Sequence, residues 1–382
     1  MRKIALVLVI ILSLLQTGCW NAREIDELGF VLSIGLDKDE NGFKVTAQIA
    51  SPETYSKTLS GMITKPFWMV SSTGKTIFEA IRNMASISSR RIFWSHIKVI
   101  LISEDLAKNS TLEIFDFFTR NPELRLRTLV AVTPGEAGKL LEVVPVMEKD
   151  PAIYLEKIIQ NKSLTGKSYN IMLKDFIQDY LDPNVAPVTS RIVLDKSKQE
   201  PVLKTSGAYV FDKNNLPIPL TEQNTRGLLW IKKKMNDSIM VVNCPYDDMP
   251  TSLEIKKANI GFKSGVDNEI PLFTINLKVT ATLTEQSCLT NFNDISKLKE
   301  LESAMEEVIR KDIQSTITVA KDLKIDFIGL SSILHSQHKE EWHQISSKWN
   351  TLFTNTDVSI VVKVDISHIS LAKPLEPITK QD

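Results

Sequence analysis

The chain has no excess of charge of either sign, few cysteines and no hydrophobic run long enough to cross a bilayer. Its 46 Lys and Arg residues match its 46 Asp and Glu residues, so the formal net charge is zero. Nucleic-acid-binding domains usually carry a basic excess, and disordered chains combine high net charge with few apolar residues. Three cysteines in 382 residues are too few for a disulfide-built secreted scaffold. With 43% hydrophobic residues, the sequence instead indicates a folded protein of two or three domains.

The N-terminal residues have the pattern of a secretory signal peptide. Arg2 and Lys3 precede an apolar run over residues 4–15. Twelve helical residues span about 18 Å, well short of the hydrocarbon core of about 30 Å. A positive start followed by a short apolar region is typical of a signal peptide and not of a membrane span. We therefore assign residues 1–18 to a signal peptide.

Small residues precede Cys19 directly after this apolar run, and the segment Leu15-Gln16-Thr17-Gly18-Cys19 resembles the bacterial lipobox. Such a cysteine receives a diacylglyceryl group and, after cleavage and N-acylation, becomes the lipidated N-terminus. Gln16 departs from the pattern, because a leucine usually stands there. The alternative is an unmodified cysteine in an ordinary signal peptide. Cleavage would leave 364 residues with 44 basic and 46 acidic side chains. Two acyl chains suffice for stable attachment, so we expect a lipid-anchored body in water.

The patterns of residues 19–382, which we call the body, predict an α+β protein of three domains. Residues 28–36, 43–49, 67–70, 97–102 and 126–132 have strand patterns, and residues 76–84 and 112–118 have helical spacing. These elements indicate an N-terminal α+β domain over residues 19–134. Residues 135–200 are mainly helical by pattern and interrupted by prolines, and residues 201–382 form a C-terminal α+β domain. A hairpin turn is expected at Asn41-Gly42.

The C-terminal domain has the most regular pattern. Apolar and polar residues alternate over residues 273–283 and again over residues 358–366. Between them, an apolar stripe over residues 295–320 follows helical spacing, and Asp294 is a suitable N-cap. We predict a long-stranded antiparallel sheet with an amphipathic helix packed on its face.

Three segments resemble fragments of ligand-binding motifs, and each lacks an essential part. Residues 37–42 match the first half of an EF-hand loop, but Gln48 stands where a bidentate Glu is needed. The triplets at residues 74–76 and 166–168 match the end of a P-loop, but Met69 and Asn161 replace its first glycine. We interpret the first segment as a hairpin turn and the two triplets as polar starts of helices.

The sequence also offers no convincing metal or catalytic constellation. His335, His338 and His343 would spread too widely around one helix to converge on a zinc ion. Cys244 and Cys288 could form a disulfide, although two cysteines so far apart in sequence are more often separate buried thiols. We therefore predict no catalytic residue, no metal ligand, no cofactor-binding residue and no enzymatic activity.

Several motifs together resemble the Ger(x)C family, the lipoprotein C subunits of spore germinant receptors. The opening block is the most specific, with Gly18-Cys19-Trp20, the acidic run Glu24-Ile25-Asp26-Glu27, Gly29-Phe30-Val31 and Ile34-Gly35-Leu36-Asp37. Further matches lie at residues 48–52, 76–82, 90–98 (Arg90-Arg91-Ile92-Phe93-Trp94-Ser95-His96-Ile97-Lys98) and 120–125 (Arg120-Asn121-Pro122-Glu123-Leu124-Arg125). The last segment that resembles the family is Thr225-Arg226-Gly227-Leu228-Leu229-Trp230. Residues 214–220 depart from the family, which commonly has a glycine-containing turn there.

The resemblance implies a three-domain, non-enzymatic receptor subunit, needed for germination in response to nutrients. It would be anchored through Cys19 (diacylglyceryl and N-acyl, such as palmitate) on the outer face of the spore inner membrane. Its partners would be two integral-membrane subunits of the A and B types, with no nucleic acid. An alternative is a solute-binding lipoprotein that captures the nutrient directly, although the long strands after residue 250 argue against its usual two-lobed form. An extracytoplasmic hydrolase using His335 or His338 is a third.

Overall fold

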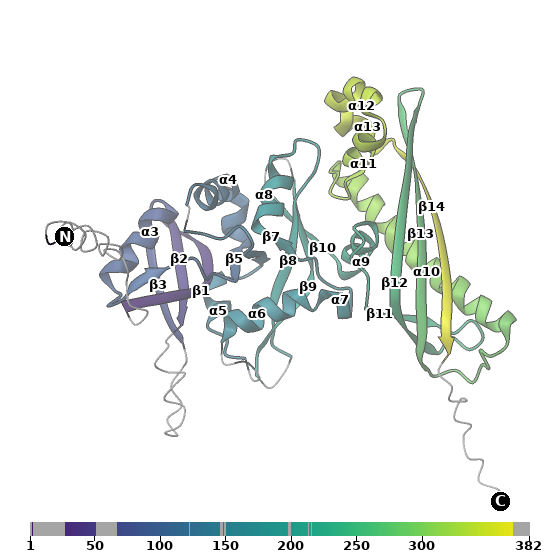
Figure 1. Ribbon diagram of the computed structural model, residues 1–382, viewed down its shortest axis with the longest axis horizontal. Coiled ribbons are helices and arrows are strands. Elements are labelled where there is room, and N and C mark those ends of the chain that lie inside the picture. The colour runs from purple at the N-terminus through teal and green to yellow at the C-terminus, as the bar shows by residue number, and fades with distance from the viewer. Residues whose placement is uncertain are drawn as a thin grey trace, which may run out of the picture.

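A computed structural model describes Arg2 and residues 27–50 and 67–369, except residues 122, 146, 147, 149, 198, 199, 213 and 215. The described chain forms two sheets that lie side by side along the long axis of the molecule (Figure 1). The first has ten strands in the order β10-β9-β8-β6-β5-β1-β2-β3, with β4 beside β1 and β7 beside β6. The second has four strands in the order β11-β12-β13-β14. We call the parts built on them the N-terminal unit and the C-terminal unit.

The strands of the first sheet run from residue 28 to residue 220. They are β1 (Leu28–Asp39), β2 (Gly42–Ala50), β3 (Phe67–Gly74), β4 (Arg91–Phe93), β5 (Val99–Ser103), β6 (Leu129–Thr133), β7 (Ile171–Met172), β8 (Val188–Asp195), β9 (Val202–Phe211) and β10 (Pro217–Leu220). At its centre β1, β5, β6 and β8 are parallel. The predicted hairpin is confirmed, because β1 and β2 pair from Asp39 and Gly42 outwards.

Helices cover both faces of this sheet, which explains the apolar runs of its central strands. They are α3 (Ile77–Asn83), the 3-10 helix η3 (Met84–Ser86), α4 (Glu104–Arg120), α5 (Ala137–Leu141), α6 (Pro151–Gln160), α7 (Lys162–Thr165) and α8 (Leu173–Leu181). All five residues of β5 and all five of β6 are buried. One set of their side chains packs with α5 and α6, and the other packs with α4 and α8.

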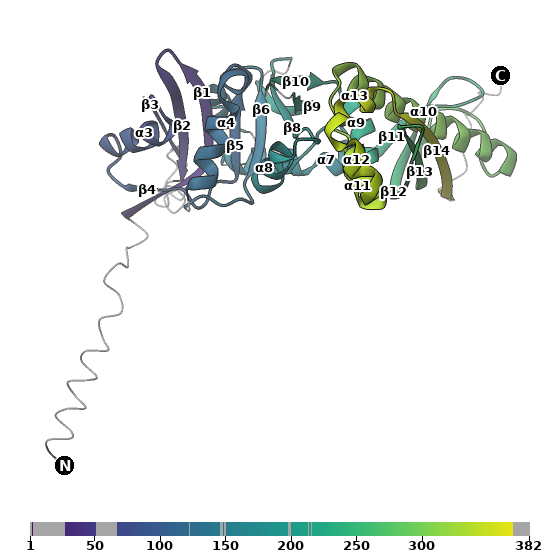
Figure 2. The same cartoon turned by 90° about the horizontal axis from the view of Figure 1, so that it is seen from above.

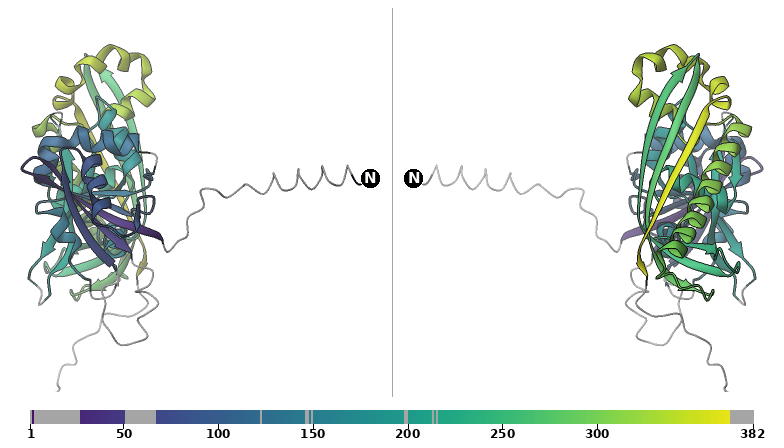
Figure 3. Two further views of the ribbon diagram at one scale, coloured as in Figure 1. Left: turned by 90° about the vertical axis from the view of Figure 1, so that its left-hand side faces the viewer. Right: turned by 90° about the vertical axis from the view of Figure 1, so that its right-hand side faces the viewer.

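The C-terminal unit consists of four strands, a long helix and several short helices. They are α9 (Glu222–Ile231), β11 (Ile239–Asn243), β12 (Pro250–Asp267), β13 (Ile270–Gln286), α10 (Ile295–Leu323), α11 (Leu330–Gln337), α12 (Lys339–Ile345), η4 (Ser346–Lys348), α13 (Trp349–Thr354) and β14 (Asp357–Ile369). Helix α10 lies along one face of the sheet (Figure 3). Asp294 caps it as predicted, accepting a hydrogen bond from Ser296 N at 2.9 Å.

The α+β class is confirmed, but one detail of the C-terminal sheet differs from the prediction. Strands β11, β12 and β13 are antiparallel, whereas β14 pairs with β13 in parallel, from Leu272 opposite Asp357 onwards. The reason is the long helix between them. Over its 29 residues, α10 carries the chain about 43 Å back towards the start of β13. The next strand therefore runs in the direction of β13, as strands joined by a helical crossover do.

The expected domain limits near residues 134 and 200 do not coincide with a change of sheet. Strands β6 and β8, on either side of the first limit, are parallel neighbours. Strands β8 and β9, on either side of the second, pair from Asp195 opposite Val202 onwards. The change of sheet comes later, between β10 and β11, where α9 lies between the two units (Figure 1).

Candidate functional site

The site residue that the sequence singles out, Cys19, lies outside the described residues. So do residues 1 and 3–18 of the signal peptide, which include Gln16, and also Glu24 and Asp26. The continuous described part begins with Glu27, whose side chain is exposed, and Leu28, which pairs with Arg91 of β4.

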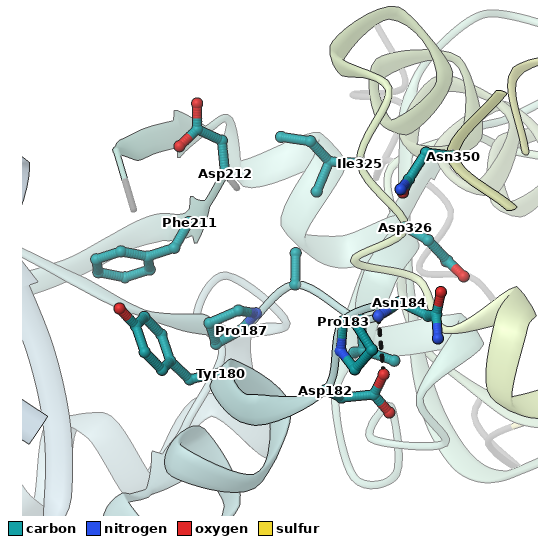
Figure 4. Close-up of a pocket in the computed structure, with 12 residues that line it drawn as sticks. Tyr180, Asp182, Pro183, Asn184, Pro187, Phe211, Asp212, Ile325, Asp326 and Asn350 are labelled. Atoms are coloured by element: carbon teal, nitrogen blue, oxygen red, sulfur yellow. Dashed lines mark hydrogen bonds between the residues drawn. The ribbon is translucent and has the colours of Figure 1, made fainter. Parts of the chain in front are cut away.

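One pocket lies where the two units meet (Figure 4). It has a volume of about 260 Å³ and is lined by residues 182–187, which connect α8 to β8, and by Tyr180, Phe211, Asp212, Ile325, Asp326 and Asn350. Figure 4 shows Tyr180 and Phe211 on one side, and Asp326 and Asn350 on the other. The ionisable groups among these lining residues are aspartates and one tyrosine. This set provides no nucleophile with an adjacent base.

Asp326 has a structural role beside this pocket. Its carboxylate accepts hydrogen bonds from Gly329 N (2.7 Å), Leu330 N (3.0 Å) and Ser331 N (2.7 Å), at the start of α11. Burial raises the pKa of Asp326, although the backbone donors oppose this effect. Ser331 Oγ also donates to the carbonyl oxygen of Asn184 at 3.2 Å. The pocket is thus bordered by contacts that hold the two units together.

A second and larger pocket, of about 820 Å³, lies between α3 and α4. We call it the α3–α4 groove. Its lining combines aromatic rings with side chains of both charges: Phe43, Phe78, Phe117, Lys75, Arg82, Arg120, Glu113, Asp116 and Glu123. Arg82 lies over the ring of Phe78, 4.9 Å from its centroid. Arg120 donates from Nε to both carboxylate oxygens of Asp116, at 2.7 and 2.9 Å. The groove could hold a small zwitterion, because it offers both charges beside apolar surface.

Lys75 and Thr76 of the triplet Gly74-Lys75-Thr76 line this groove, and the triplet leads into a helix as predicted. Thr76 Oγ1 accepts a hydrogen bond from Glu79 N at 3.1 Å, and Glu79 Oε2 accepts one from Lys75 N at 2.8 Å. Thr76 therefore caps the helix as in a capping box, although Glu79 reaches back to the residue before the cap and not to the cap itself. The prediction for residues 166–168 is wrong, because Gly166 follows the end of α7 with φ at +64° and does not begin a helix.

The segment Asp37–Asn41 also has a role other than metal binding. Asp37 is 3% exposed, and its two carboxylate oxygens accept hydrogen bonds from Ala137 N (2.7 Å) and Gly138 N (2.8 Å). It therefore holds the start of α5 against β1. Gly35 permits this approach, because a Cβ there would lie 2.9 Å from Gly138 N. The Gly35-x-Asp37 pattern is explained by this contact.

A charged contact joins α9 to α10. Arg226 donates from Nε and Nη2 to the two carboxylate oxygens of Asp312, at 2.5 and 2.9 Å. The Asp312 side chain is only 2% exposed, and the ion pair raises the pKa of Arg226. At Gly227 an added Cβ would overlap Thr316 Oγ1 and the carbonyl oxygen of Asp312. Arginine and glycine in this motif thus allow the two helices to pack closely.

The three clustered histidines lie on two helices, whereas the argument against a zinc site placed them on one helix. His335 lies on α11, His343 on α12, and His338 at the junction between them. Their rings are used in other contacts: His335 stacks on Trp342, and His338 Nε2 is 2.8 Å from the carbonyl oxygen of Ser264. In the part of the chain that the structure describes, the histidines form no metal-ligand cluster.

Cys244 and Cys288 are free, buried thiols that the fold brings together. With a carboxylate oxygen of Asp247, their sulfur atoms form a group in which all ligand atoms lie within 4.8 Å of one another. The sequence interval of 44 residues gave no sign of this proximity, because it depends on the pairing of β12 with β13.

Comparison with known proteins accounts for nearly the whole chain. Residues 21–194 match the model of the spore germination protein N-terminal domain, and residues 206–370 match that of the spore germination B3/GerAC-like C-terminal domain. The chain belongs to the Ger(x)C family of spore germination proteins. Spore germination protein B3 of Bacillus subtilis is 28% identical over 363 residues, with 92% of each chain covered. Spore germination protein GerQC of Bacillus cereus is 21% identical, covering 94% of this chain and 97% of the relative.

The fold agrees with that of a solved family member. The crystal structure of the GerBC protein matches 90% of this chain and 100% of its own, with a TM-score of 0.58 and 20% sequence identity. Within the described residues of this Ger(x)C protein, no helix is both long and apolar enough to cross a membrane.

Two further Ger(x)C motifs lie close together in space, although 21 residues separate them in sequence. Residues 90–98 include β4 and lead into β5, and residues 120–125 begin at the last residue of α4 and lead towards β6. Ser95 Oγ donates to the carbonyl oxygen of Glu123 at 2.7 Å, and Thr128 Oγ1 donates to that of Ile97 at 3.0 Å. Both motifs therefore lie at the edge of the sheet where β1 begins.

Proposed function

We propose that this protein is the lipid-anchored, non-enzymatic C subunit of a nutrient germinant receptor. The observation that carries the proposal is the match of two consecutive family domains over residues 21–194 and 206–370. Directly upstream of the first match stand a signal-peptide pattern and Cys19 in a lipobox-like segment. In this proposal Cys19 carries the acyl chains, and the body lies on the outer face of the spore inner membrane.

The body would bind two integral-membrane receptor subunits. A protein of this architecture offers mixed sheets, exposed loop edges and a groove, all of which can serve as contact surfaces. Its proposed role is to support the assembly or activity of the receptor, while the membrane subunits respond to the nutrient.

The experiment compares spores that carry the native gene, no gene or the Cys19→Ala variant. We expect the deletion to abolish or strongly slow germination with the nutrient that this receptor serves, and to leave germination through other receptors unchanged. We expect the variant to leave the membrane fraction when the partner subunits are absent. A Cys19→Ala protein that stays in the membrane without its partners would contradict the lipid anchor. Normal nutrient germination in every deletion strain tested would contradict the receptor role.

A second candidate function is direct capture of the nutrient, and the α3–α4 groove favours it. Its volume of about 820 Å³ exceeds what one amino acid needs, and its lining offers Arg82 beside Phe78 as well as Glu113. Titration calorimetry of the full chain with amino acids and sugars tests this alternative. Saturable binding that is lost in an Arg82→Gln/Glu113→Gln variant would support it. The absence of any heat of binding across the nutrients that germinate these spores would exclude it.

A further inference from the structure

We propose that the edge of the N-terminal unit where β1 begins faces the bilayer, and that its arginines bind the phosphate groups of anionic lipids. This inference rests on the proposed lipidation of Cys19. We call this surface the basic edge. It comprises Arg91, His96, Arg125 and Arg127, together with the exposed apolar residues Ile87 and Leu126.

The topology of the sheet brings these residues to one end. Strands β1, β5 and β6 are parallel, so their starts lie at the same edge. Arg91 is on β4, beside the start of β1 at Leu28 (Figure 2). The loop over residues 121–128 precedes β6 and is joined to the segment before β5 by the bond from Ser95 Oγ to the Glu123 carbonyl oxygen.

The distance from the anchor to this edge is limited by chain length. Cys19 precedes Leu28 by nine residues, and a fully extended chain spans at most about 3.6 Å per residue. The start of β1 therefore lies within about 32 Å of the lipidated cysteine. It is also the part of the sheet that follows the anchor most directly along the chain. The short connection holds this edge, and not the C-terminal unit, close to the bilayer.

The charges of the edge suit an anionic surface. Arg91, Arg125 and Arg127 are exposed, and among the residues that the structure describes no carboxylate forms an ion pair with any of them. Glu123 lies in the same loop as Arg125 and Arg127, and Asp175 follows Lys174, whose backbone N donates to the Leu126 carbonyl oxygen at 2.9 Å and whose side chain pairs with Asp175. Arginine side chains strengthen attachment to an anionic leaflet, and this effect falls off within a Debye length of about 8 Å at physiological ionic strength.

Two exposed apolar side chains are close to these arginines in sequence, Leu126 between two of them and Ile87 four residues before Arg91. Leu126, between Arg125 and Arg127, is 46% exposed, and Ile87 is 55% exposed. Arginines that flank an apolar side chain are suited to the boundary between head groups and acyl chains. Since the processed chain would carry a net charge of −2, the body as a whole is not attracted to an anionic membrane, and a local basic surface adds to the orientation that the short anchor connection imposes.

The test measures how close this edge lies to the head groups. The full chain with native Cys19, processed in a bacterial host, is reconstituted into vesicles of phosphatidylcholine with or without phosphatidylglycerol, both containing a lipid with a nitroxide on its head group. A fluorophore is attached at Leu126→Cys or, as a control, at Val241→Cys of β11, which is 54% exposed. Cys244 and Cys288 are each 2% exposed, which protects them from labelling.

We expect stronger quenching at position 126 than at position 241, and a larger difference with phosphatidylglycerol. The Arg91→Gln/Arg125→Gln/Arg127→Gln variant should reduce quenching at position 126 by about two-fold or more. The matched control replaces the exposed lysines Lys257, Lys263 and Lys278 of the C-terminal sheet and should leave quenching unchanged.

Two results would overturn the proposal while leaving the anchor intact. One is equal quenching at both positions, and the other is quenching at position 126 that does not depend on head-group charge or on the three arginines. A native chain that does not float with the vesicles and has an unmodified Cys19 by mass spectrometry would overturn the anchor and the orientation together. The flotation and mass measurements therefore test the lipid anchor, and the quenching measurements test the contact of the basic edge with lipid head groups.

A second, independent site lies in the C-terminal unit, where Cys244, Asp247 and Cys288 converge. Cys244 follows β11, and Cys288 follows β13. Backbone and side-chain hydrogen bonds fix both loops: Cys244 N donates to the Met249 carbonyl oxygen at 2.8 Å, and Gln286 Nε2 donates to the Cys288 carbonyl oxygen at 2.9 Å. Both thiols are buried and the carboxylate is exposed, so the site is open on one side.

We infer that these three side chains bind a divalent ion of the zinc class, with water as the fourth ligand. Two cysteine sulfurs and one carboxylate oxygen are ligands that zinc prefers in tetrahedral sites. Binding requires both thiols to release their protons, which leaves two thiolates, one carboxylate and the ion with a net charge of −1. Because binding releases these two protons, the affinity should fall as the pH decreases.

Metal analysis of the purified full chain tests this site. After dialysis against buffered zinc we expect one ion per chain, and with cobalt we expect thiolate-to-metal charge-transfer absorption. Cys288→Ser and Asp247→Asn should lose at least about ten-fold in affinity, whereas Asp248→Asn, at the neighbouring carboxylate, should not. A mass lower by two hydrogens with no free thiol would show a disulfide and overturn the proposal. Two free thiols with no bound ion would overturn it equally.

Discussion

The two sheets of this protein differ in how many of their faces are covered by helices. The N-terminal sheet is covered by helices on both faces, and every residue of β5 and β6 is buried. The C-terminal sheet is covered by α10 on one face, and along β13 buried and exposed residues alternate. Parallel strands covered on both sides are expected to be apolar throughout, and strands with one wet face are expected to alternate. The difference shows that burial on one or two faces decides the sequence pattern of a strand.

The close contacts of the two units also differ. In the N-terminal unit a buried carboxylate, Asp37, binds backbone N–H groups at the start of α5. In the C-terminal unit α9 and α10 are joined by the ion pair of Arg226 with Asp312 and by the absence of a side chain at Gly227. Substitutions at these positions show whether the two units depend on these contacts to the same degree.

The largest effect is expected at Gly227, where α9 approaches α10. In Gly227→Ala the added methyl group overlaps Thr316 and the backbone of Asp312, so the helices must separate. We expect a loss of about 3 kcal/mol or more in the free energy of unfolding. Urea denaturation followed by circular dichroism measures it. Gly261→Ala on β12 is the control, because nothing lies within 4 Å of its added Cβ. A Gly227→Ala protein as stable as this control would show that the contact is unimportant.

Removing one partner of the ion pair should have the next largest effect. Arg226→Leu leaves the buried carboxylate of Asp312 without its partner, which costs about 2–4 kcal/mol, less than a fully buried pair because Arg226 is 30% exposed. The double variant Arg226→Leu/Asp312→Leu should recover most of that loss. Thermal unfolding of the four proteins gives the coupling energy. Strictly additive losses would contradict a direct interaction between the two side chains.

In the N-terminal unit, Asp37→Ala should cost about 2–3 kcal/mol, because it leaves two buried N–H groups without an acceptor. Desolvation raises the pKa of Asp37 above its ordinary value of 3.8. A raised pKa in the folded state means that protonation of Asp37 favours folding. The part of the free energy of unfolding that depends on this protonation is therefore complete below pH 3.8 and is lost as the pH rises through the raised pKa. Asp37→Asn should lack this part of the pH dependence, which unfolding measured at several pH values detects. The same slope in both proteins would assign it to another group.

The smallest effect is expected at the hairpin between β12 and β13. Its two turn residues, Asn268 and Glu269, have φ values of +48° and +66°, which glutamate adopts at a cost. Glu269→Gly should stabilise the C-terminal unit by about 0.5–1 kcal/mol. Chemical denaturation with Glu285→Gly, within β13, as a destabilising comparison measures the difference. Destabilisation by both variants would show that the turn does not carry this strain.

Much of the fold could be predicted from the sequence, because many of its patterns are local. The strand patterns at residues 43–49 and 273–283 correspond to β2 and β13, and the apolar stripe at residues 295–320 corresponds to α10. No local pattern predicts the bounds of β12, since exposed and half-buried residues, including Gly261 and Gly265, interrupt its alternation. Its long pairing with β13 stabilises it, and such a partner is not visible in a local pattern.

The contacts around the candidate sites could be predicted only in part. The Gly35-x-Asp37 and Arg226-Gly227 motifs were singled out by family resemblance, but their physical reasons lie in α5 and α10, about 100 and 86 residues away along the chain. The proximity of Cys244 to Cys288 and of residues 90–98 to residues 121–128 likewise depends on strand pairing. No spacing in the sequence encodes these distances.

The sequence by itself determined the family, the α+β class, the N-terminal signal pattern with Cys19, and the caps of α3 and α10. These properties depend on residue identities and on short-range hydrogen bonds. The tertiary structure alone decided that β14 runs parallel to β13, that one sheet continues through residues 134 and 200, and that scattered arginines gather at the edge where β1 begins. These properties depend on which strands pair over long distances, and such pairing is chosen by the burial of whole faces and not by any local pattern.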